Sequence, residues 1–365
     1  MKALTIGGAM LDSIALIDSA RIERMSMRNA EASFLLLEEG RKTETEEIST
    51  HIGGGAVNAA IAMARLGLDV SSIVKLGADQ RADAILARLE SEGVSTRWVT
   101  RDSRLPTGAS LLISSHDRNA AVFTFRGANT LLQISDFKPG AFGVDVVYIS
   151  SLSNQSADCF PDLVKAGREN HCLVAANPGI RQLTARGRAF MDAIASIDIL
   201  LINRAEASAL VPALSAAVGE GGPSLPFDPE EEDVPDLVRR GLSSGGFEMS
   251  LLRFFGCLLN AGARMIVITD GRHGAFVATQ TEVFFCSAVP THVVGTTGAG
   301  DAFAATFVAF TAMKHPLKQT LLAATLNAGS VVRYADTQSG LLRYAELEEQ
   351  IAAREHEAVF RTWPI

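Results

Sequence analysis

The sequence predicts an α/β fold in which helices cover both faces of a mostly parallel sheet. Short apolar runs recur along the 365 residues, and several are continuous rather than alternating. Continuous apolar runs are typical of strands that are buried on both faces of a parallel sheet. Longer helix-like stretches separate these runs, as βαβ units require. We therefore expect one doubly wound, layered sheet.

The elements follow one another in a regular order along most of the chain. The predicted strands are short apolar runs at residues 3–6, 72–76, 144–149, 172–175, 199–202, 265–269 and 275–279. The predicted helices lie between them, at residues 56–66, 82–92, 161–169, 186–195 and 301–313. This alternation places the connecting helices on the two faces of the sheet.

Two early stretches break the alternation. Residues 13–51 contain apolar segments such as 34–37. Residues 107–126 are typical of a β-hairpin with its turn at 116–119, and no helical pattern surrounds them. Both could belong to a small sheet outside the main one, such as a lid over a cleft. The alternative is that they are two surface segments without a shared function.

A third irregular stretch, residues 215–246, is rich in glycine and proline and carries an acidic cluster at 228–236. A connection of this length inside one domain is unusual. We expect a solvated loop without chemistry, although such segments can also face a partner.

Composition and charge exclude several classes of function. The chain has 33 Lys and Arg against 41 Asp and Glu, a formal net charge of −8. Nucleic-acid wrapping needs a basic surface, so no nucleic-acid partner is expected. No run reaches the roughly 18 apolar residues of a membrane span, and the N-terminus lacks a signal-peptide pattern. The four cysteines form no CxxC pair, which favours buried thiols and a cytoplasmic location.

The strongest local signal is the segment 295–301, GTTGAGD, which leads into a helix-like stretch. Gly298, Ala299 and Gly300 remove side-chain bulk, so successive backbone N–H groups can converge on an anion. The following helix adds its N-terminal dipole. Such a pocket suits the charge that develops during phosphoryl transfer. Asp301 stands beside it, where a carboxylate can accept a proton from an attacking hydroxyl. A helix cap with a tight turn would give the same pattern.

A second glycine-rich segment, GGGAVN at residues 53–58, also opens a predicted helix. Gly54 and Gly55 would allow a ligand to approach the backbone, and Asn58 offers both a donor and an acceptor. Asp12 follows the first strand and could accept hydrogen bonds from neighbouring hydroxyls of a polyol. Taken singly, Asn58 packing a turn and Asp12 capping one are equally acceptable interpretations.

Three further segments are less specific. Asn203 and Glu206 are three residues apart at a helix start, where they could orient hydrated Mg²⁺ and phosphate oxygens or form a plain N-terminal cap. Residues 268–274, ITDGRHG, end one strand and open another. Asn327, in a helix-like stretch, could reach a nucleotide base.

In their order, these motifs resemble those of the ribokinase-like (PfkB-type) carbohydrate and nucleoside kinases, from residue 1 to about 350. The matching segments are GGGAVNAAIAMARLG from Gly53, RGAN at 126–129, NRAE at 203–206, ITDGRHG at 268–274, TTGAGDAF from Thr296 and NAGSVV at 327–332. Several ordered matches are far more specific than any one of them.

The resemblance implies a ribokinase-like three-layer αβα sandwich with a mostly parallel central sheet and a small β-sheet lid. The kinase core would comprise residues 1–12, 52–106 and 127–365, and the lid residues 13–51 and 107–126. The implied reaction is ATP-dependent phosphorylation of a hydroxymethyl group with Mg²⁺. Family members often dimerise through the lid, so a homodimer of that kind is also implied.

The resemblance also implies residue roles. Asp301 would be the general base, and the amides of Gly298, Ala299 and Gly300 would form the anion hole. The substrate would be held by Asp12, Gly54, Gly55, Asn58 and Asn129. The nucleotide site would include Asn203, Glu206, Thr269, Gly271, Gly274 and Asn327. Glu206 would organise Mg²⁺ through water.

Two positions depart from the family pattern. Gly295 stands where the family usually carries an Asp that helps form a monovalent-cation site, so the resemblance does not extend to that cation. Elsewhere Asn177 and Arg181 are kept, but Ala175 replaces the usual acid, which alters a contact on the phosphate side. Neither change touches Asp301.

The expected substrate is a small sugar of the ribose, fructose or ketodeoxy-sugar class, because Asp12 and Asn58 suit adjacent hydroxyls. The alternative is a nucleoside kinase of the adenosine, inosine or guanosine class, with residues 34–37, Phe123 and Phe125 as a wall for the base. A third hypothesis is a catalytically weak ligand-binding regulator on the same fold. The loss of Asp at position 295 and the acidic insert motivate it.

Overall fold

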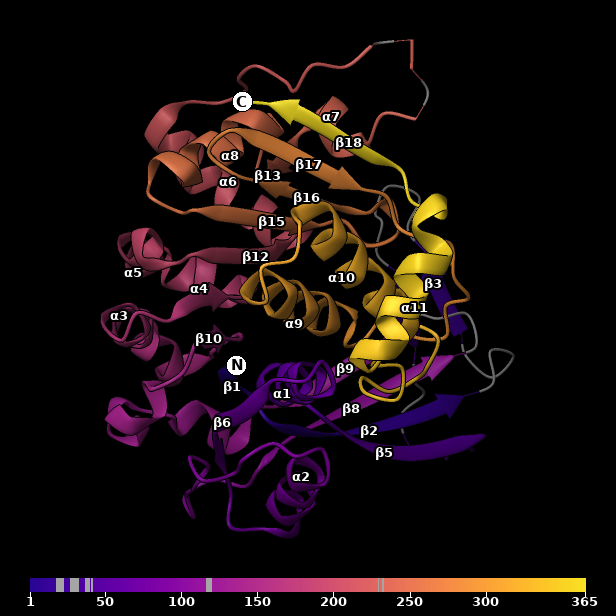
Figure 1. Cartoon of the computed structure of the whole chain (residues 1–365). Coiled ribbons are helices and arrows are strands. Elements are labelled where there is room, and N and C mark those ends of the chain that lie inside the picture. The colour runs from indigo at the N-terminus through magenta and orange to yellow at the C-terminus, as the bar shows by residue number, and fades with distance from the viewer. Residues whose placement is uncertain are drawn as a thin grey trace.

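A ten-stranded sheet forms the centre of the computed structural model, which describes residues 1–17, 23–26, 33–36, 40, 42–115, 120–228, 230–231 and 233–365. The strand order is β18-β17-β16-β15-β12-β11-β10-β1-β6-β7 (Figure 1). The bounds are β1 Lys2–Gly7, β6 Asp69–Leu76, β7 Thr100–Arg101, β10 Val146–Ile149, β11 Leu173–Ala176, β12 Ile199–Asn203, β15 Met265–Thr269, β16 Ala275–Ala278, β17 Glu282–Cys286 and β18 Phe360–Pro364.

The strands from β7 to β15 pair in parallel, and β16, β17 and β18 continue the sheet in antiparallel pairs. All seven predicted strands are present within one or a few residues of their expected bounds. The predicted mostly parallel sheet is therefore confirmed. The strands β17 and β18 at one end of the sheet and the short strand β7 at the other were not predicted from the sequence.

Helices cover both faces of this sheet. They are α1 Gly55–Arg65, α2 Gln80–Ser91, α3 Phe160–Glu169, α4 Ile180–Ala185, α5 Gly187–Ala193, α6 Arg204–Val218, α7 Asp236–Arg240, α8 Leu251–Asn260, α9 Ala299–Ala312, α10 Leu317–Val331 and α11 Tyr344–Arg354. One hydrophobic cluster joins the sheet to α3, α6 and α8, and a second joins it to α1, α9 and α10 (Figure 1).

Alternation along each strand divides its side chains between the two clusters. In β10, Val147 and Ile149 belong to the cluster that contains α3, whereas Val146 and Tyr148 belong to the cluster that contains α9. Both faces of the strand are therefore buried, which explains its continuous apolar sequence. The three-layer αβα architecture predicted from the sequence is confirmed.

A separate four-stranded sheet contains strands from both early stretches, residues 13–51 and 107–126. Its order is β5-β2-β8-β9, with β2 Met10–Ile17, β5 Glu47–Gly53, β8 Gly108–Ser115 and β9 Ala120–Phe125. β2 and β8 pair in parallel, and the other pairs are antiparallel. The strands β3 Glu23–Ser26 and β4 Ser33–Leu36 form their own hairpin. The predicted turn at 116–119 and residue Leu37 lie outside the described residues.

The small sheet begins earlier than the sequence suggested. β2 starts at Met10, so Asp12 is a residue of the small sheet and not of the core, contrary to the boundary expected after residue 12. The chain leaves β1 through Gly7 and Gly8, which allow it to change direction at once.

The segment 215–246 is more ordered than a solvated loop. It contains the end of α6, the short helix α7 and the hairpin strand β13 Leu242–Ser244, which pairs with β14 Phe247–Met249. Its buried apolar side chains are Leu225, Val234, Leu237, Val238 and Leu242. Because these side chains join the core beside α6 and α8, the expectation of a wholly solvated loop is wrong. Pro229 and Glu232 lie outside the described residues.

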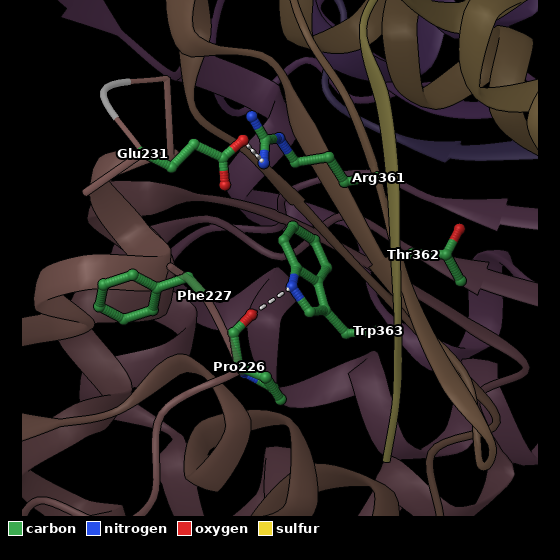
Figure 2. A pocket seen from close by; sticks show the side chains of 6 residues that line it. All are labelled: Pro226, Phe227, Glu231, Arg361, Thr362 and Trp363. Atoms are coloured by element: carbon green, nitrogen blue, oxygen red, sulfur yellow. Dashed lines mark hydrogen bonds and ion pairs between the residues drawn. The ribbon is translucent and has the colours of Figure 1, made fainter. Parts of the chain in front are cut away.

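This insert packs against the edge strand β18 and lines a pocket there (Figure 2). Trp363 Nε1 donates to the carbonyl oxygen of Pro226 at 2.7 Å, and Arg361 Nη1 pairs with Glu231 Oε1 at 2.6 Å. Covering an edge strand in this way protects it from pairing with another chain.

The described part of the chain holds no helix of the length and apolar character that a bilayer crossing demands. The four cysteines are free thiols, and three of them are buried.

Candidate active site

The first turns of α1 and α9 meet beside the carboxyl end of β1. Asn58 Nδ2 donates to Asp301 Oδ2 at 2.8 Å, although 243 residues separate them in the chain. A crevice outside the carboxyl ends of parallel strands is where open α/β sheets bind their ligands. The structure therefore brings together two of the residues that the sequence placed in one site.

Asp301 has the environment of a proton acceptor. Burial raises the pKa of its carboxyl above the ordinary value, the hydrogen bond from Asn58 opposes this, and the charge of Asp12 adds to the rise. A Cβ atom built on Gly55 would lie 3.4 Å from Asp301 Oδ1, so this oxygen lies directly over that glycine. Asn58 binds Oδ2, whereas Oδ1 accepts no hydrogen bond from the residues that the structure describes.

Gly298 precedes α9 in a left-handed conformation, with φ +84°. A Cβ atom there would come within 2.6 Å of Thr337 Cβ, so glycine is needed for both the backbone angle and the space. No side chain among the described residues caps α9. The Ala299 N–H makes a long hydrogen bond of 3.4 Å to the carbonyl oxygen of Thr296. The Gly300 N–H lies at the same helix start, where N–H groups without helical partners can bind an anion.

Asp12 lies on one face of the small sheet together with other polar residues. In the strand register it stands opposite His51 on β5 and Ser110 on β8, and Ser110 stands opposite Thr124 on β9. The hydroxyl of Ser110 donates to Asp12 Oδ1. Burial raises the pKa of Asp12, whereas Ser110 and the charge of His51 lower it. This face presents a set of hydrogen-bonding groups for a polyhydroxy ligand.

The glycines at 53 and 54 join the small sheet to α1. A Cβ atom on Gly53 would lie 2.1 Å from Asp12 Oδ2, so the carboxylate rests against the bare backbone. Gly54 has φ +100°, and a Cβ atom there would lie 2.5 Å from the carbonyl oxygen of Gly8. Gly53 was not among the predicted site residues, although it shapes the position of Asp12.

Asn203 and Glu206 form a capping box at the start of α6. The Glu206 N–H donates to Asn203 Oδ1, and the Asn203 N–H donates to Glu206 Oε2, both at 2.9 Å. The helix-cap interpretation is therefore confirmed. Burial raises the pKa of Glu206, and the charge of Asp301 contributes, which shows that the two carboxylates share one electrostatic environment.

Tyr148 lies close enough to Asp301 and Glu206 to feel their charges, and it was missed from the sequence. Its hydroxyl is buried and has no hydrogen-bond partner within the described ranges. Burial raises its pKa, as do the charges of Asp301 and Glu206. Tyr148 is the register neighbour of Ala175, where the family usually carries an acid. An unpartnered buried hydroxyl beside two carboxylates fits a further polar group at this place.

Two predicted ligand residues, Asn129 and Asn327, use their amides in hydrogen bonds within the protein. Both N–H groups of the Asn129 amide donate to backbone carbonyls, those of Ala9 and Arg126, and its Oδ1 accepts from the Ala9 N–H. Asn129 therefore ties β9 to the start of β2.

Asn327 is completely buried, and its role near a nucleotide base stays a prediction. Its Nδ2 donates to Thr306 Oγ1 at 2.8 Å, and its Oδ1 accepts from the Leu342 N–H at 3.0 Å. The amide therefore links α10 to α9 and to the segment before α11.

The predicted nucleotide segment 268–274 lies at the end of β15. Thr269 is partly exposed and Gly271 is exposed, so both can line a ligand site there. Gly274 is buried beneath the turn, where a Cβ atom would lie 2.2 Å from the carbonyl oxygen of Cys286. Beside the turn, Asp270 forms an ion pair with Arg204 at 3.3 Å.

Other residues of the site were also missed, for different reasons. His51, Ser110 and Thr124 become visible only once the strand register is known, because alternation then places them on the face of Asp12. Thr337 and Gln338 lie in an irregular segment with no recognisable motif, yet both donate to Asn58.

Comparisons with known proteins agree with this fold. The family model described as pfkB family carbohydrate kinase matches residues 12–231 and 250–343. The deoxyribokinase of Salmonella typhi is 23% identical over 345 residues, covering 94% of this chain and 99% of the relative.

Solved structures show the same fold. An E. coli chain solved in complex with ATP and Mg²⁺ superposes with a TM-score of 0.72 at 17% identity, over 96% of this chain and 99% of that one. The nucleoside kinase of Methanocaldococcus jannaschii superposes with a TM-score of 0.69 at 16% identity, over 96% and 98%. The chain therefore belongs to the pfkB family of carbohydrate kinases, whose members are phosphotransferases with an alcohol group as acceptor.

Proposed function

We propose that this chain uses ATP to phosphorylate a hydroxymethyl group of a small sugar. The observation that carries the proposal is the pairing of Asn58 with Asp301 directly beside the uncapped start of α9. A carboxylate base then lies beside the backbone N–H groups that begin α9. Phosphoryl transfer to an alcohol needs this combination.

The transfer follows from the geometry of these groups. Asp301 Oδ1 accepts the proton of the substrate hydroxyl while the hydroxyl oxygen bonds to the γ-phosphorus of ATP. The bond between this phosphorus and the bridging oxygen breaks, and that oxygen leaves with ADP. The N–H groups at the start of α9 stabilise the negative charge on the transferred group. Asn58 keeps the carboxylate oriented throughout.

The residues at this site fit ATP and Mg²⁺. Mg²⁺ retains most of its water and binds through few carboxylates. Glu206 would hold it through water, and the unpartnered hydroxyl of Tyr148 would contact that hydration shell. Bound Mg²⁺ neutralises charge on the phosphates. Thr269 and Gly271 would line the nucleotide side. Gly295 offers no carboxylate, so the proposal includes no monovalent cation.

The small sheet acts as the lid of this site in our proposal. Its polar face carries Asp12, so closure of the sheet would bring Asp12 to the substrate hydroxyls and exclude water from the transfer. Excluding water limits wasteful hydrolysis of ATP.

Two arginines favour an acidic sugar within the expected substrate classes. Arg126 directly follows the last residue of β9, and Arg181 lies in α4 after the carboxyl end of β11. Burial lowers the pKa of Arg126, and the neighbouring charge of Arg181 adds to this. Two close guanidinium groups are unfavourable unless an anion lies between them, and they bind carboxylates bidentately. This favours a ketodeoxy-sugar acid.

A coupled assay of ADP release tests the substrate class. We expect turnover with a ketodeoxy-sugar acid, and a rise in KM of about 10- to 100-fold in Arg126→Gln and Arg181→Gln, because each loses a charge-assisted hydrogen bond. Neutral sugars should show no such rise. The matched control is Arg97→Gln, since Arg97 lies over the Trp98 ring at the surface. Equal KM changes for neutral and acidic sugars would contradict the acidic-sugar assignment.

The nucleoside alternative loses one of its supports. Phe123 and Phe125 flank Thr124 along β9, so they point to the face opposite Asp12 and form no wall for a base in the site. Turnover with adenosine, inosine or guanosine but with no sugar would establish the nucleoside kinase nevertheless. ATP turnover with none of them would favour the regulator hypothesis.

The face of the small sheet opposite Asp12 is suited to a second copy of the chain. It exposes Ile48 by 67%, Leu111 by 42%, Phe123 by 56% and Phe125 by 47%. Soluble monomers rarely expose so many neighbouring apolar side chains. We expect a dimer in light scattering and a monomer in the Phe123→Ser variant, with Val122→Ser on the other face as the control. A wild-type monomer at all concentrations would contradict this interface.

A further inference from the structure

Two buried residues between α10 and α11 hold the amide of Asn58. Thr337 Oγ1 donates to Asn58 Oδ1 at 2.9 Å, and Gln338 Nε2 donates to the same oxygen at 3.2 Å and to the carbonyl oxygen of Ile52 at 2.7 Å. Thr337 is 5% exposed and Gln338 is 4% exposed. Because the amide oxygen faces two donors, the amide nitrogen faces Asp301.

Arg88, at the end of this chain of hydrogen bonds away from Asp301, determines which groups donate and which accept. Arg88 Nε donates to Gln338 Oε1 at 3.0 Å. Arginine has donors but no acceptor, so the oxygen of Gln338 must face Arg88 and its NH₂ group must face Asn58. Glu92 holds Arg88 at 2.8 Å and Arg65 at 2.6 Å, and Arg65 Nη1 donates to the carbonyl oxygen of Gln338 at 2.9 Å. Both the side chain and the backbone of Gln338 are therefore anchored.

Thr337 also supports the loop before α9. The Cβ position of Gly298 lies within 2.6 Å of Thr337 Cβ, so the two residues pack without space between them. The same residue thus contacts the partner of the base and the start of the anion-binding turn.

We propose that Thr337 and Gln338 are positioning residues that lock the Asn58 amide with its NH₂ group toward Asp301. This inference rests on the proposed function, in which Asp301 is the base. The lock keeps Asp301 Oδ2 hydrogen-bonded and leaves Oδ1 to the substrate. It also opposes the effect of burial on the carboxyl, since a donor favours the charged form.

Loss of the lock has a defined consequence. Without Thr337 and Gln338, the amide of Asn58 can rotate by half a turn, which would place its oxygen against the Asp301 carboxylate. The carboxylate then loses a donor and faces an acceptor, so its pKa rises further. A merely structural role in holding the segment would leave this pKa unchanged.

The test is the pKa of Asp301, measured by ¹³C NMR of the side-chain carboxyl in protein with labelled aspartate, the signal being assigned by Asp301→Asn. We expect Thr337→Val and Gln338→Met each to raise it and the double variant to raise it by about one pH unit. The matched control is Thr311→Val, because within the described ranges the Thr311 hydroxyl bonds only to a carbonyl of its own helix, at 2.8 Å. Circular dichroism confirms that each variant is folded.

An Asn58→Ala background tests whether Thr337 and Gln338 affect Asp301 through Asn58. In this background, adding Thr337→Val or Gln338→Met should not change the pKa of Asp301 from its value in the Asn58→Ala variant alone. An unchanged pKa in the single and double variants, or a full further shift in the Asn58→Ala background, would overturn the proposal. The NMR readout needs no turnover, so a raised pKa in an inactive protein would support the lock and contradict the proposed function instead.

Discussion

Replacing Asp301 with asparagine is expected to lower kcat by about 10²- to 10⁴-fold, the usual cost of losing general-base catalysis. Asparagine has nearly the same shape, so the substrate should still bind and KM should change little. The wild-type enzyme should lose activity as the pH falls through the pKa of Asp301, which burial raises above the ordinary value for aspartate. That acidic limb should be absent from the residual activity of Asp301→Asn. Steady-state kinetics with ADP detection across pH measures both effects.

The control for this variant is Asp83→Asn. Asp83 is an exposed residue in the first turn of α2 whose partner is Arg101, and exposed ion pairs contribute little to stability. It should behave as wild type. An Asp301→Asn variant with wild-type kcat would exclude Asp301 as the base.

Replacing Gly298 with alanine is expected to lower kcat by about 10²- to 10³-fold, the size of effect seen when one donor of an oxyanion hole is lost. The left-handed backbone costs a residue with a Cβ atom roughly 1–2 kcal/mol. The new methyl group would also collide with Thr337, so the turn must move. Movement of the turn redirects the N–H groups at the start of α9 away from the phosphoryl group.

Gly256→Ala in α8 is the matched control for Gly298→Ala. Nothing lies within 4 Å of a Cβ atom on Gly256, and alanine is the better helix former. We expect unchanged kinetics and an equal or higher melting temperature. If Gly298→Ala kept full activity in a folded protein, the turn before α9 could not be the anion-binding element.

The layers of the fold could be predicted because local sequence determines them. A strand such as β10 is apolar throughout, since its two faces meet two different clusters. The strand β18 could not be found in this way, because only Trp363 among its residues is buried and its pairing with β17 is a contact across the chain. For α6 the sequence indicated only the start, at Asn203 and Glu206, because the helix continues through Pro212 into a segment whose glycines and prolines favour a loop.

The candidate site was predictable where one short segment supplies several groups. The turn before α9 carries its glycines, its helix start and Asp301 together, so the sequence alone indicates an anion site. Asn327 shows the limit, because its amide is used by Thr306 and Leu342, partners that no local pattern reveals. Thr337 was invisible for the same reason, since it acts on Asn58 from 279 residues away.

The central claim is that this site transfers a phosphoryl group from ATP to a sugar hydroxyl. The most direct test is mass spectrometry of the products after incubation with ATP, Mg²⁺ and each of a panel of sugars, sugar acids and nucleosides. The account predicts a phosphate monoester of a sugar or sugar acid, formed in equal amount with ADP and absent with Asp301→Asn. ADP release without a phosphorylated acceptor, or an ester formed equally well by Asp301→Asn, would contradict it.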